Sequence, residues 1–220
     1  MSRKSRSNHE IVDEALNLDG NPENIRRFYD GWADKYDEDV VDIAYSGPDT
    51  IAGLMDKHAD QLGASGRDTL RILDAGCGTG LSGEALYRRG FRDIHGFDLS
   101  PEMAERAAKR DCYTRAVGGV DMMKAADRFE PGSYDAAISV GVFTLGHVPP
   151  EALGVLVKLV RPGGLVALST RIQYFEESNY RQVVRDLTEA GRIRLLDQIE
   201  DANYTSDGAG HFWAYQVVRQ

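Results

Sequence analysis

The sequence predicts an α/β protein with a doubly wound, mostly parallel sheet. From about residue 70 onward, short apolar runs typical of buried strands alternate with helical patterns. A glycine-rich loop follows the first of these runs, in the stretch LDAGCGTG at 73–80. The chain has 220 residues, 42% of them hydrophobic, which suffices for one sizeable core.

The segment before that alternation is expected to be helical. Residues 21–40 form one helical candidate, in which Asn21 can cap the start and Pro22 suits the first turn. A second helix is expected over 48–62, because its apolar residues recur at three- and four-residue steps. The basic stretch MSRKSRSNHE begins the chain, and we interpret 1–8 as a disordered tail. Residues 9–62 are interpreted as a helical lid on a core that spans 63–220.

Within that core each expected element follows from an apolar run, a cap or a turn residue. Ser100 and Pro101 predict the start of one helix, and the RPGG stretch at 161–164 predicts a turn. Strands are expected at 71–75, 93–100, 113–117, 133–142, 165–170, 192–197 and 211–218, and helices at 81–90, 100–110, 149–160 and 178–190.

Composition and charge exclude several classes of function. The net charge of −9 argues against a nucleic-acid surface, which needs clustered Lys and Arg. No apolar run approaches the ~18 residues of a membrane span, and no secretory signal is recognisable. The two cysteines, Cys77 and Cys112, lack metal-ligand spacing and indicate a reducing, cytoplasmic location. We therefore expect no metal, no nucleic acid and no membrane partner.

The glycine-rich loop allows two interpretations. Residues 78–83 fit the dinucleotide fingerprint G-x-G-x-x-G, and Asp98 lies 18 residues after Gly80, so a nicotinamide enzyme is a fair alternative. In the dinucleotide fold, however, the fingerprint begins where the strand ends. Here the strand is expected to end near Ala75, before that match. The carboxylate of Asp74 would also repel a pyrophosphate at close range.

A cationic ligand without phosphate fits the same residues better. Asp74 can attract an ammonium group, and Asp98 can accept hydrogen bonds from both hydroxyls of a ribose. Glycines at 76, 78 and 80 (Gly76, Gly78 and Gly80) let the backbone approach the ligand closely. A cationic, ribose-bearing molecule without phosphate describes S-adenosyl-L-methionine (SAM).

Four motifs in order resemble the class I SAM-dependent methyltransferases. LDAGCGTG matches the first motif of that family, GFDLSPEM resembles the second, YDAAISVGVF the fourth, and LVRPGGLVALS the entry to the fifth strand. The resemblance covers residues 71–183. It implies a Rossmann-like methyltransferase fold of seven strands, with the last strand, near 211–220, inserted antiparallel. FYDGWADKYDEDV and GVFTLGHVPPEAL further resemble the methyltransferase-like proteins named for the Williams–Beuren syndrome region and their bacterial relatives.

The resemblance also implies residues that contact the cofactor. Leu99 and Met103 would flank the adenine. The backbone amide of Val120 and the carboxylate of Asp121 would read the edge of the ring and its exocyclic amine. Val140, in the fourth motif, belongs to the same set. The first motif adds two further members, Asp74 and Cys77. The side chain of Cys77 is expected to pack within the loop.

The N-terminal aromatic residues have both a packing and a binding interpretation. Phe28, Trp32 and Tyr36 recur every four residues, which is typical of a helix face packed on the sheet. Aromatic faces also attract a sulfonium cation, and a tyrosine hydroxyl can hold the cofactor's carboxylate. We therefore count Tyr29, Trp32 and Tyr36 among the candidate cofactor-binding residues. His147, after the fourth expected strand, is the candidate general base.

Together these features predict methyl transfer to a small-molecule acceptor by direct displacement, with O, N or S as the attacking atom. The N/D-P-P-[YFW] stretch of many base-amino methyltransferases is absent, because SVGV occupies 139–142. The sequence leaves open a SAM-binding protein without methyl transfer, a protein methyltransferase and the nicotinamide oxidoreductase. It does not determine the oligomeric state.

Overall fold

The computed structural model describes residues 8–63, 65–206 and 208–219, and it contains one sheet of seven strands. The strand order is β3-β2-β1-β4-β5-β7-β6. All neighbouring pairs from β3 to β5 are parallel, and β7 is antiparallel to both β5 and β6. The strands are β1 (Arg71–Ala75), β2 (Asp93–Phe97), β3 (Arg115–Val117), β4 (Tyr134–Phe143), β5 (Val160–Arg171), β6 (Ile193–Thr205) and β7 (Gly208–Val217). The doubly wound α/β fold with an antiparallel last strand is therefore confirmed.

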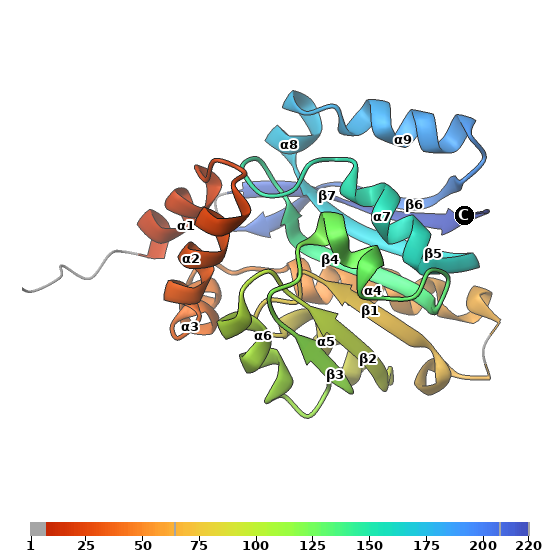
Figure 1. Ribbon diagram of the computed structural model, residues 1–220, viewed down its shortest axis with the longest axis horizontal. Helices are drawn as coiled ribbons and strands as arrows, with labels where there is room; N and C mark the ends of the chain where they lie inside the picture. The colour runs from red at the N-terminus through yellow and green to blue at the C-terminus, as the bar shows by residue number, and fades with distance from the viewer. Residues whose placement is uncertain (1–7, 64, 207, 220) are drawn as a thin grey trace, which may run out of the picture.

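Helices cover both faces of the sheet and one of its ends (Figure 1). The α-helices are α1 (Asn8–Leu16), α2 (Pro22–Trp32), α3 (Tyr36–Asp42), α4 (Gly47–His58), α5 (Leu81–Arg88), α6 (Pro101–Ala108), α7 (Ala152–Leu159), α8 (Ile172–Glu177) and α9 (Tyr180–Glu189). Among the described residues three 3-10 helices accompany them, η1 (Ala59–Leu62), η2 (Arg67–Thr69) and η3 (Met122–Asp127). Of the described helices, none is long and apolar enough to cross a membrane.

The sheet separates two hydrophobic cores. Alternate residues of each strand point to opposite faces, so Leu73 packs with α7 and η3 on one face while Ile72 packs with α4 and α5 on the other. Both side chains are fully buried. Because the central strands β1, β4 and β5 are covered on both sides, they read in the sequence as nearly continuous apolar runs.

The segment expected to be a lid, 9–62, divides into two parts. Helices α1, α2 and α3 stand together at one end of the sheet (Figure 1). Helix α4 instead lies on a face of the sheet, where Ile51 and Met55 are fully buried in the core. The apolar stripe that predicts this helix is thus satisfied by the sheet. Residues 1–7 of the expected tail lie outside the described residues, and Asn8 begins α1.

The prediction of one helix over 21–40 is wrong. Helix α2 ends at Trp32, and α3 begins at Tyr36 after a break. The break brings the rings of these two residues to 4.7 Å between centroids. It also lets the indole N–H of Trp32 donate to Asp39 Oδ2 at 2.7 Å. The break in the helical pattern thus coincides with local contacts of a large aromatic side chain.

Other differences lie in the C-terminal half. Helix α8 is not predicted by the sequence, and β6 runs to Thr205, well beyond the expected 197. The RPGG stretch lies inside β5 as a local irregularity: Gly163 has φ +82°, and the β4–β5 register shifts between the pairs Tyr134–Val160 and Ala136–Leu165. The start of α6 is as predicted, because Ser100 Oγ accepts from the Met103 N–H at 3.1 Å.

Candidate cofactor and active site

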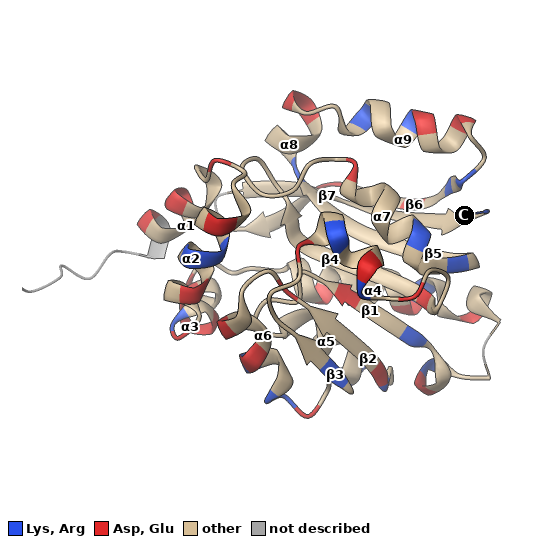
Figure 2. Ribbon diagram, in the orientation of Figure 1, with Lys and Arg blue, Asp and Glu red and all other residues tan. Residues whose placement is uncertain are grey.

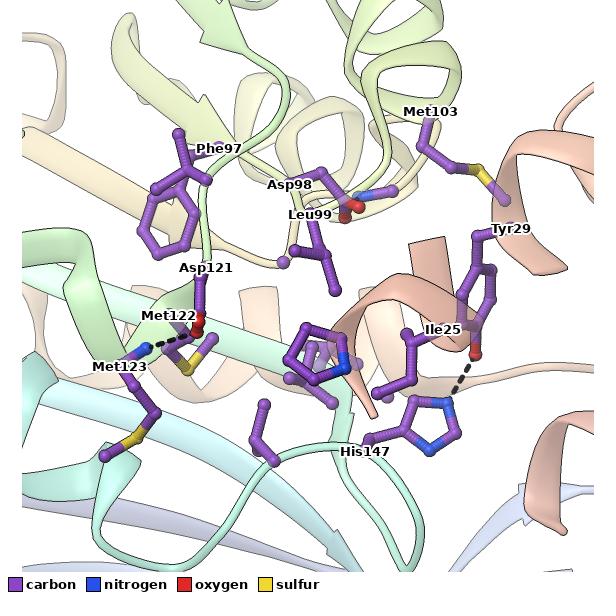
Figure 3. Close-up of a pocket in the computed structure, with 18 of the residues that line it drawn as sticks. Ile25, Tyr29, Phe97, Asp98, Leu99, Met103, Asp121, Met122, Met123 and His147 are labelled. Atoms are coloured by element: carbon purple, nitrogen blue, oxygen red, sulfur yellow. Dashed lines mark hydrogen bonds between the residues drawn. The ribbon is translucent and has the colours of Figure 1, made fainter. Parts of the chain in front are cut away.

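A cavity of about 290 Å³ lies beyond the carboxyl ends of β1, β2 and β4. In a doubly wound sheet this edge, where the strand order reverses around β1, is where ligands bind. We call this space the main cavity (Figure 3). Its walls include most of the predicted site residues, namely Tyr29, Tyr36, Gly76, Gly78, Asp98, Leu99, Met103, Val120, Asp121, Val140 and His147.

The glycine loop forms the floor of the main cavity. The amides of Gly76 and Cys77 both donate to the Phe97 carbonyl at 2.9 Å, which ties the loop to the end of β2. Gly78 has φ +53°, and a Cβ placed there would meet nothing within 4 Å. A Cβ at Gly76 would instead lie 2.4 Å from Val142. The absence of side chains therefore serves close packing at Gly76 and leaves open space at Gly78.

The carboxylate of Asp98 is held on both oxygens by backbone amides. Gly78 N–H donates to Oδ2 and Ser100 N–H donates to Oδ1, both at 2.8 Å. Burial raises the pKa of Asp98 to about 6, although these two hydrogen bonds oppose the shift. Each carboxylate oxygen can accept a second hydrogen bond, so two positions remain for the hydroxyls of a ligand.

The loop after β3 differs in detail from the expectation. The amide of Val120 donates to the Asp98 carbonyl at 3.0 Å, so it is engaged within the protein and not free to read a base. Asp121 caps η3, its Oδ1 accepting from the Met123 N–H at 2.9 Å (Figure 3). Its carboxylate and the neighbouring Met122 still line the main cavity.

Helix α2 closes the main cavity through a tyrosine–histidine pair. Tyr29 Oη and His147 Nε2 lie 2.8 Å apart, as the dashed line in Figure 3 marks. His147 Nδ1 lies 3.1 Å from the Leu145 carbonyl oxygen. A carbonyl can only accept, so Nδ1 carries the proton and Nε2 accepts from the Tyr29 hydroxyl. Burial lowers the pKa of His147, which keeps the imidazole neutral near pH 7.

Four predicted residues do not line the main cavity. Trp32 lines a neighbouring pocket, and the other three are buried, one at the end of β1 and two within the glycine loop itself. Asp74 is 1% exposed and accepts a hydrogen bond of 2.6 Å from Tyr113 Oη. Its burial raises the pKa of Asp74 to about 7, against the opposing hydrogen bond from Tyr113. Cys77 and Gly80 are buried as well.

Tyr113 is a residue that the sequence analysis missed. Its ring fills space left by glycines on three elements, where added Cβ atoms would lie 2.3–2.9 Å from it, namely Gly80, Gly83 and Gly96. The Gly83 N–H also donates a hydrogen bond to the Tyr113 hydroxyl at 3.2 Å. Three glycines spaced over adjoining elements, with a tyrosine downstream, were the available signal.

Two further side-chain contacts attach the N-terminal helices to the core. Ser100 Oγ donates to Asp30 Oδ1 at 2.6 Å, which joins α2 to the start of α6. The carboxylate of Asp37 on α3 accepts from Thr79 Oγ1 and from the guanidinium of Arg110. The glycine loop therefore contacts α3 through Thr79, in addition to its backbone hydrogen bonds with Phe97.

A second, smaller pocket of about 80 Å³ adjoins the main cavity. Four residues line both spaces and form the wall between them, namely Tyr29, Tyr36, Gly141 and His147. The remaining lining is mostly apolar or aromatic, and it includes one arginine, Arg171. We call this space the arginine pocket.

The residues of the main cavity fit SAM and do not fit a dinucleotide. Its described lining includes neither Lys nor Arg, so it offers no cation to a pyrophosphate. It does offer the carboxylates of Asp98 and Asp121 and the aromatic rings of Tyr29 and Tyr36. The surrounding helices are acidic (Figure 2): eleven Asp and Glu but only three Lys and Arg lie between residues 8 and 46. Such a field favours a sulfonium cation.

A methyltransferase domain model matches residues 49–219. The chain belongs to the SAM-dependent methyltransferase family. This membership confirms the resemblance of the four motifs, and SAM is the cofactor. The matched range begins in α4, which agrees with the position of that helix on the sheet. The nicotinamide interpretation of the glycine loop is not supported.

Two similar proteins support the same family membership. The chain is 36% identical to the human methyltransferase-like protein 27 over 169 residues, which are 76% of this chain and 62% of that protein. It is 32% identical to a ubiquinone biosynthesis O-methyltransferase of Neisseria meningitidis over 73% of this chain and 66% of that one. The match thus spans somewhat less than two thirds of each relative.

A solved structure shows the shared fold. The magnesium protoporphyrin IX methyltransferase from Synechocystis, determined with bound S-adenosylhomocysteine (SAH), aligns with a TM-score of 0.56 at 17% identity. The alignment covers 79% of this chain and 82% of that one.

Proposed function

We propose that this protein transfers the methyl group of SAM to a small-molecule acceptor and releases SAH. The observation that carries the proposal is that His147, a neutral imidazole, lines the same cavity as Asp98. A group suited to bind ribose and a group suited to accept a proton thus share one cavity. SAM supplies an activated methyl group, so the protein mainly provides alignment, a dry site and a base.

The residues of the main cavity divide the work of holding the cofactor. In this proposal Asp98 accepts hydrogen bonds from the ribose hydroxyls through its two remaining positions. Leu99, Met103 and Val120 provide apolar surface for the adenine, and the carboxylate of Asp121 accepts from its exocyclic amine. The rings of Tyr29 and Tyr36 face the cation, whose charge aromatic faces attract.

The tyrosine–histidine pair can remove a proton from the acceptor. Tyr29 already donates to His147 Nε2, so an acceptor O–H or N–H that donates to Tyr29 Oη completes a chain. As the acceptor loses its proton to Tyr29, the tyrosine proton passes to Nε2. The imidazolium that forms keeps its Nδ1 proton on the Leu145 carbonyl. In this role His147 is the base and Tyr29 carries the proton to it.

The proposal favours a small acceptor in the cytoplasm. The pocket that adjoins the main cavity is only about 80 Å³, and residues of α1, α2 and α3 line it. One relative is named for ubiquinone biosynthesis and one structural neighbour for magnesium protoporphyrin IX, and both names refer to small molecules. Both cysteines are free and buried, in keeping with a reducing compartment.

The test is methyl transfer from tritium-labelled SAM into separated small-molecule and macromolecular fractions of a cell extract. We expect label in the small-molecule fraction. His147→Ala should lower the rate by about 100-fold or more, since general bases contribute on that scale, while SAH affinity stays near that of the wild type. His95→Gln, a histidine paired with Tyr134 outside both cavities, is the matched control.

Three outcomes would contradict parts of the proposal. Label in the macromolecular fraction would indicate a protein or nucleic-acid acceptor. SAH binding without label in either fraction would indicate a binding protein. Turnover of His147→Ala near the wild-type rate would remove the base from the mechanism.

A further inference from the structure

The arginine pocket contains a guanidinium, that of Arg171, whose charge no carboxylate of the described residues balances. Most arginines of the described chain that approach the core are ion-paired, as Arg110 is with Asp37 and Glu84. Arg171 instead lies over the ring of Tyr204, 5.4 Å from the guanidinium carbon to the ring centroid. Among the described residues no carboxylate lies within ion-pair distance of it. A partly buried guanidinium without an anion is costly, so it is normally paired.

The surroundings of Arg171 are suited to an organic anion. The described lining of the pocket includes no Asp or Glu, and its other charged candidate, His147, is neutral. Tyr45 and Tyr204 line the same space, and their hydroxyls lie 3.4 Å apart. A guanidinium offers paired N–H donors in a plane, a geometry that matches a carboxylate.

The pocket is also connected to the place of the chemistry. A chain of polar groups links Tyr204 to the wall shared with the main cavity: its hydroxyl lies 2.9 Å from Ser169 Oγ, and that oxygen accepts from the Gly141 N–H at 3.1 Å. Gly141 has φ +79°, and a Cβ there would lie 2.9 Å from the Tyr45 hydroxyl. At this point the wall is formed by a residue without a side chain.

We propose that the arginine pocket binds a carboxylate of the methyl acceptor, so that the substrate is a monocarboxylate with an apolar or aromatic body. This inference rests on the proposed function, because the pocket adjoins the site where the acceptor must be placed. The carboxylate pairs with Arg171, and the body lies against Tyr29 and His147 of the shared wall. One guanidinium balances one negative charge. A phosphate ester carries nearly two charges at pH 7 and would need a second cation.

The experiment measures binding of probes to the protein saturated with SAH, by calorimetry. The probes are benzoate, phenylacetate and octanoate, each paired with its neutral primary amide, and phenyl phosphate. At least one carboxylate should bind about tenfold or more tightly than its amide, the scale of a charge-assisted hydrogen bond. Arg171→Gln should abolish that preference, and Arg171→Lys should keep part of it.

The matched control is Arg181→Gln. Arg181 also lies over an aromatic ring, 4.3 Å from the centroid of Phe175, but lines neither cavity. It should keep the full preference for the carboxylate. The affinity of Arg171→Gln for SAH should stay within about twofold of the wild type, which shows that the variant folds.

The inference is overturned if no carboxylate binds, if the amides bind as well as the acids, or if Arg171→Gln keeps the preference. Tighter binding of phenyl phosphate than of phenylacetate would replace the monocarboxylate by a phosphate ester. Failure of the wild type to bind SAH would count against the proposed function itself, and it is measured separately from the probes.

Discussion

The two walls of the main cavity are built in different ways. The sheet-side wall, formed by Gly76, Gly78 and Asp98, is fixed by backbone hydrogen bonds at the ends of β1 and β2. Tyr29 and Tyr36 form the helix-side wall, which reaches the core mostly through side chains, as in the pair of Tyr29 with His147. One backbone hydrogen bond lies beside it, from the Gly20 N–H to the Gly146 carbonyl at 3.0 Å. Backbone contacts within a sheet are present as soon as it folds, whereas side-chain contacts between helices can open locally. We therefore propose that the sheet-side wall is preformed and that the helix-side wall is the one able to open and close.

The largest expected effect breaks the sheet-side wall. Asp98→Asn replaces an oxygen acceptor by an amide donor that faces the N–H of either Gly78 or Ser100. It also removes the charge that strengthens hydrogen bonds to ribose hydroxyls. We expect SAM affinity to fall by about 100-fold, because two charge-assisted hydrogen bonds, each contributing about tenfold, are lost. Calorimetry measures the affinity.

Asp111→Asn, an exposed residue outside the cavity, is the control for Asp98→Asn. Wild-type affinity in Asp98→Asn would mean that the carboxylate does not contact the cofactor.

The second prediction concerns the buried carboxylate of Asp74 at the end of β1. The pKa of Asp74 rises from 3.8 to about 7 on folding because the group is buried. Between these values the folded state holds more protons than the unfolded state, so the free energy of unfolding falls as the pH rises. Asp98, whose pKa is raised to about 6, acts in the same direction.

Asp74→Asn should therefore lose less stability than the wild type between pH 5 and pH 8, by about 1–3 kcal/mol. Urea unfolding without SAM at the two pH values measures the difference, in which any pH-independent cost of the amide cancels. Parallel pH profiles for the two proteins would show that Asp74 is not the group that titrates.

The smallest expected effect loosens the helix-side wall. Asp37→Ala removes the contacts of α3 with Thr79 and Arg110. The ion pair is partly exposed, so we expect the global free energy of unfolding to change by less than about 1 kcal/mol. Amide hydrogen exchange in α2 and α3 should nevertheless increase, because these helices can then open without having to break that contact.

Glu38→Ala, an exposed neighbour on the same helix, is the control for the exchange experiment. Equal exchange in Asp37→Ala and the wild type would mean that both walls are equally fixed, and the comparison would fail.

Sequence reasoning could recover the sheet side and much less of the helix side. The glycine loop and Asp98 belong to contiguous stretches whose strand-turn-helix pattern places them at one sheet edge. The pairing of Tyr29 with His147 joins residues 118 positions apart, and nothing local in the chain encodes it. The burial of Asp74 beneath Tyr113 is also a tertiary fact, since the motif alone gives a carboxylate without showing which way it faces.

Misplaced element boundaries have the same origin. The stripe of apolar residues in α4 correctly predicts a helix but cannot state that the sheet, and not the cavity, receives it. The break between α2 and α3 coincides with contacts of Trp32 to Tyr36 and Asp39, which the helical pattern of the sequence does not show. Arg171 gave no sequence signal at all, because an arginine at a strand end is ordinary until its surroundings are known.

The position of β7 constrains the order in which the protein folds. β6 pairs only with β7 within the described sheet, and β7 is the later of the two in the chain. During synthesis β6 therefore emerges from the ribosome before its sole hydrogen-bonding neighbour exists, while β1 to β5 can already pair. Unpaired strand edges are prone to aggregation. The nascent chain is most vulnerable between the emergence of Thr205 and that of Val217.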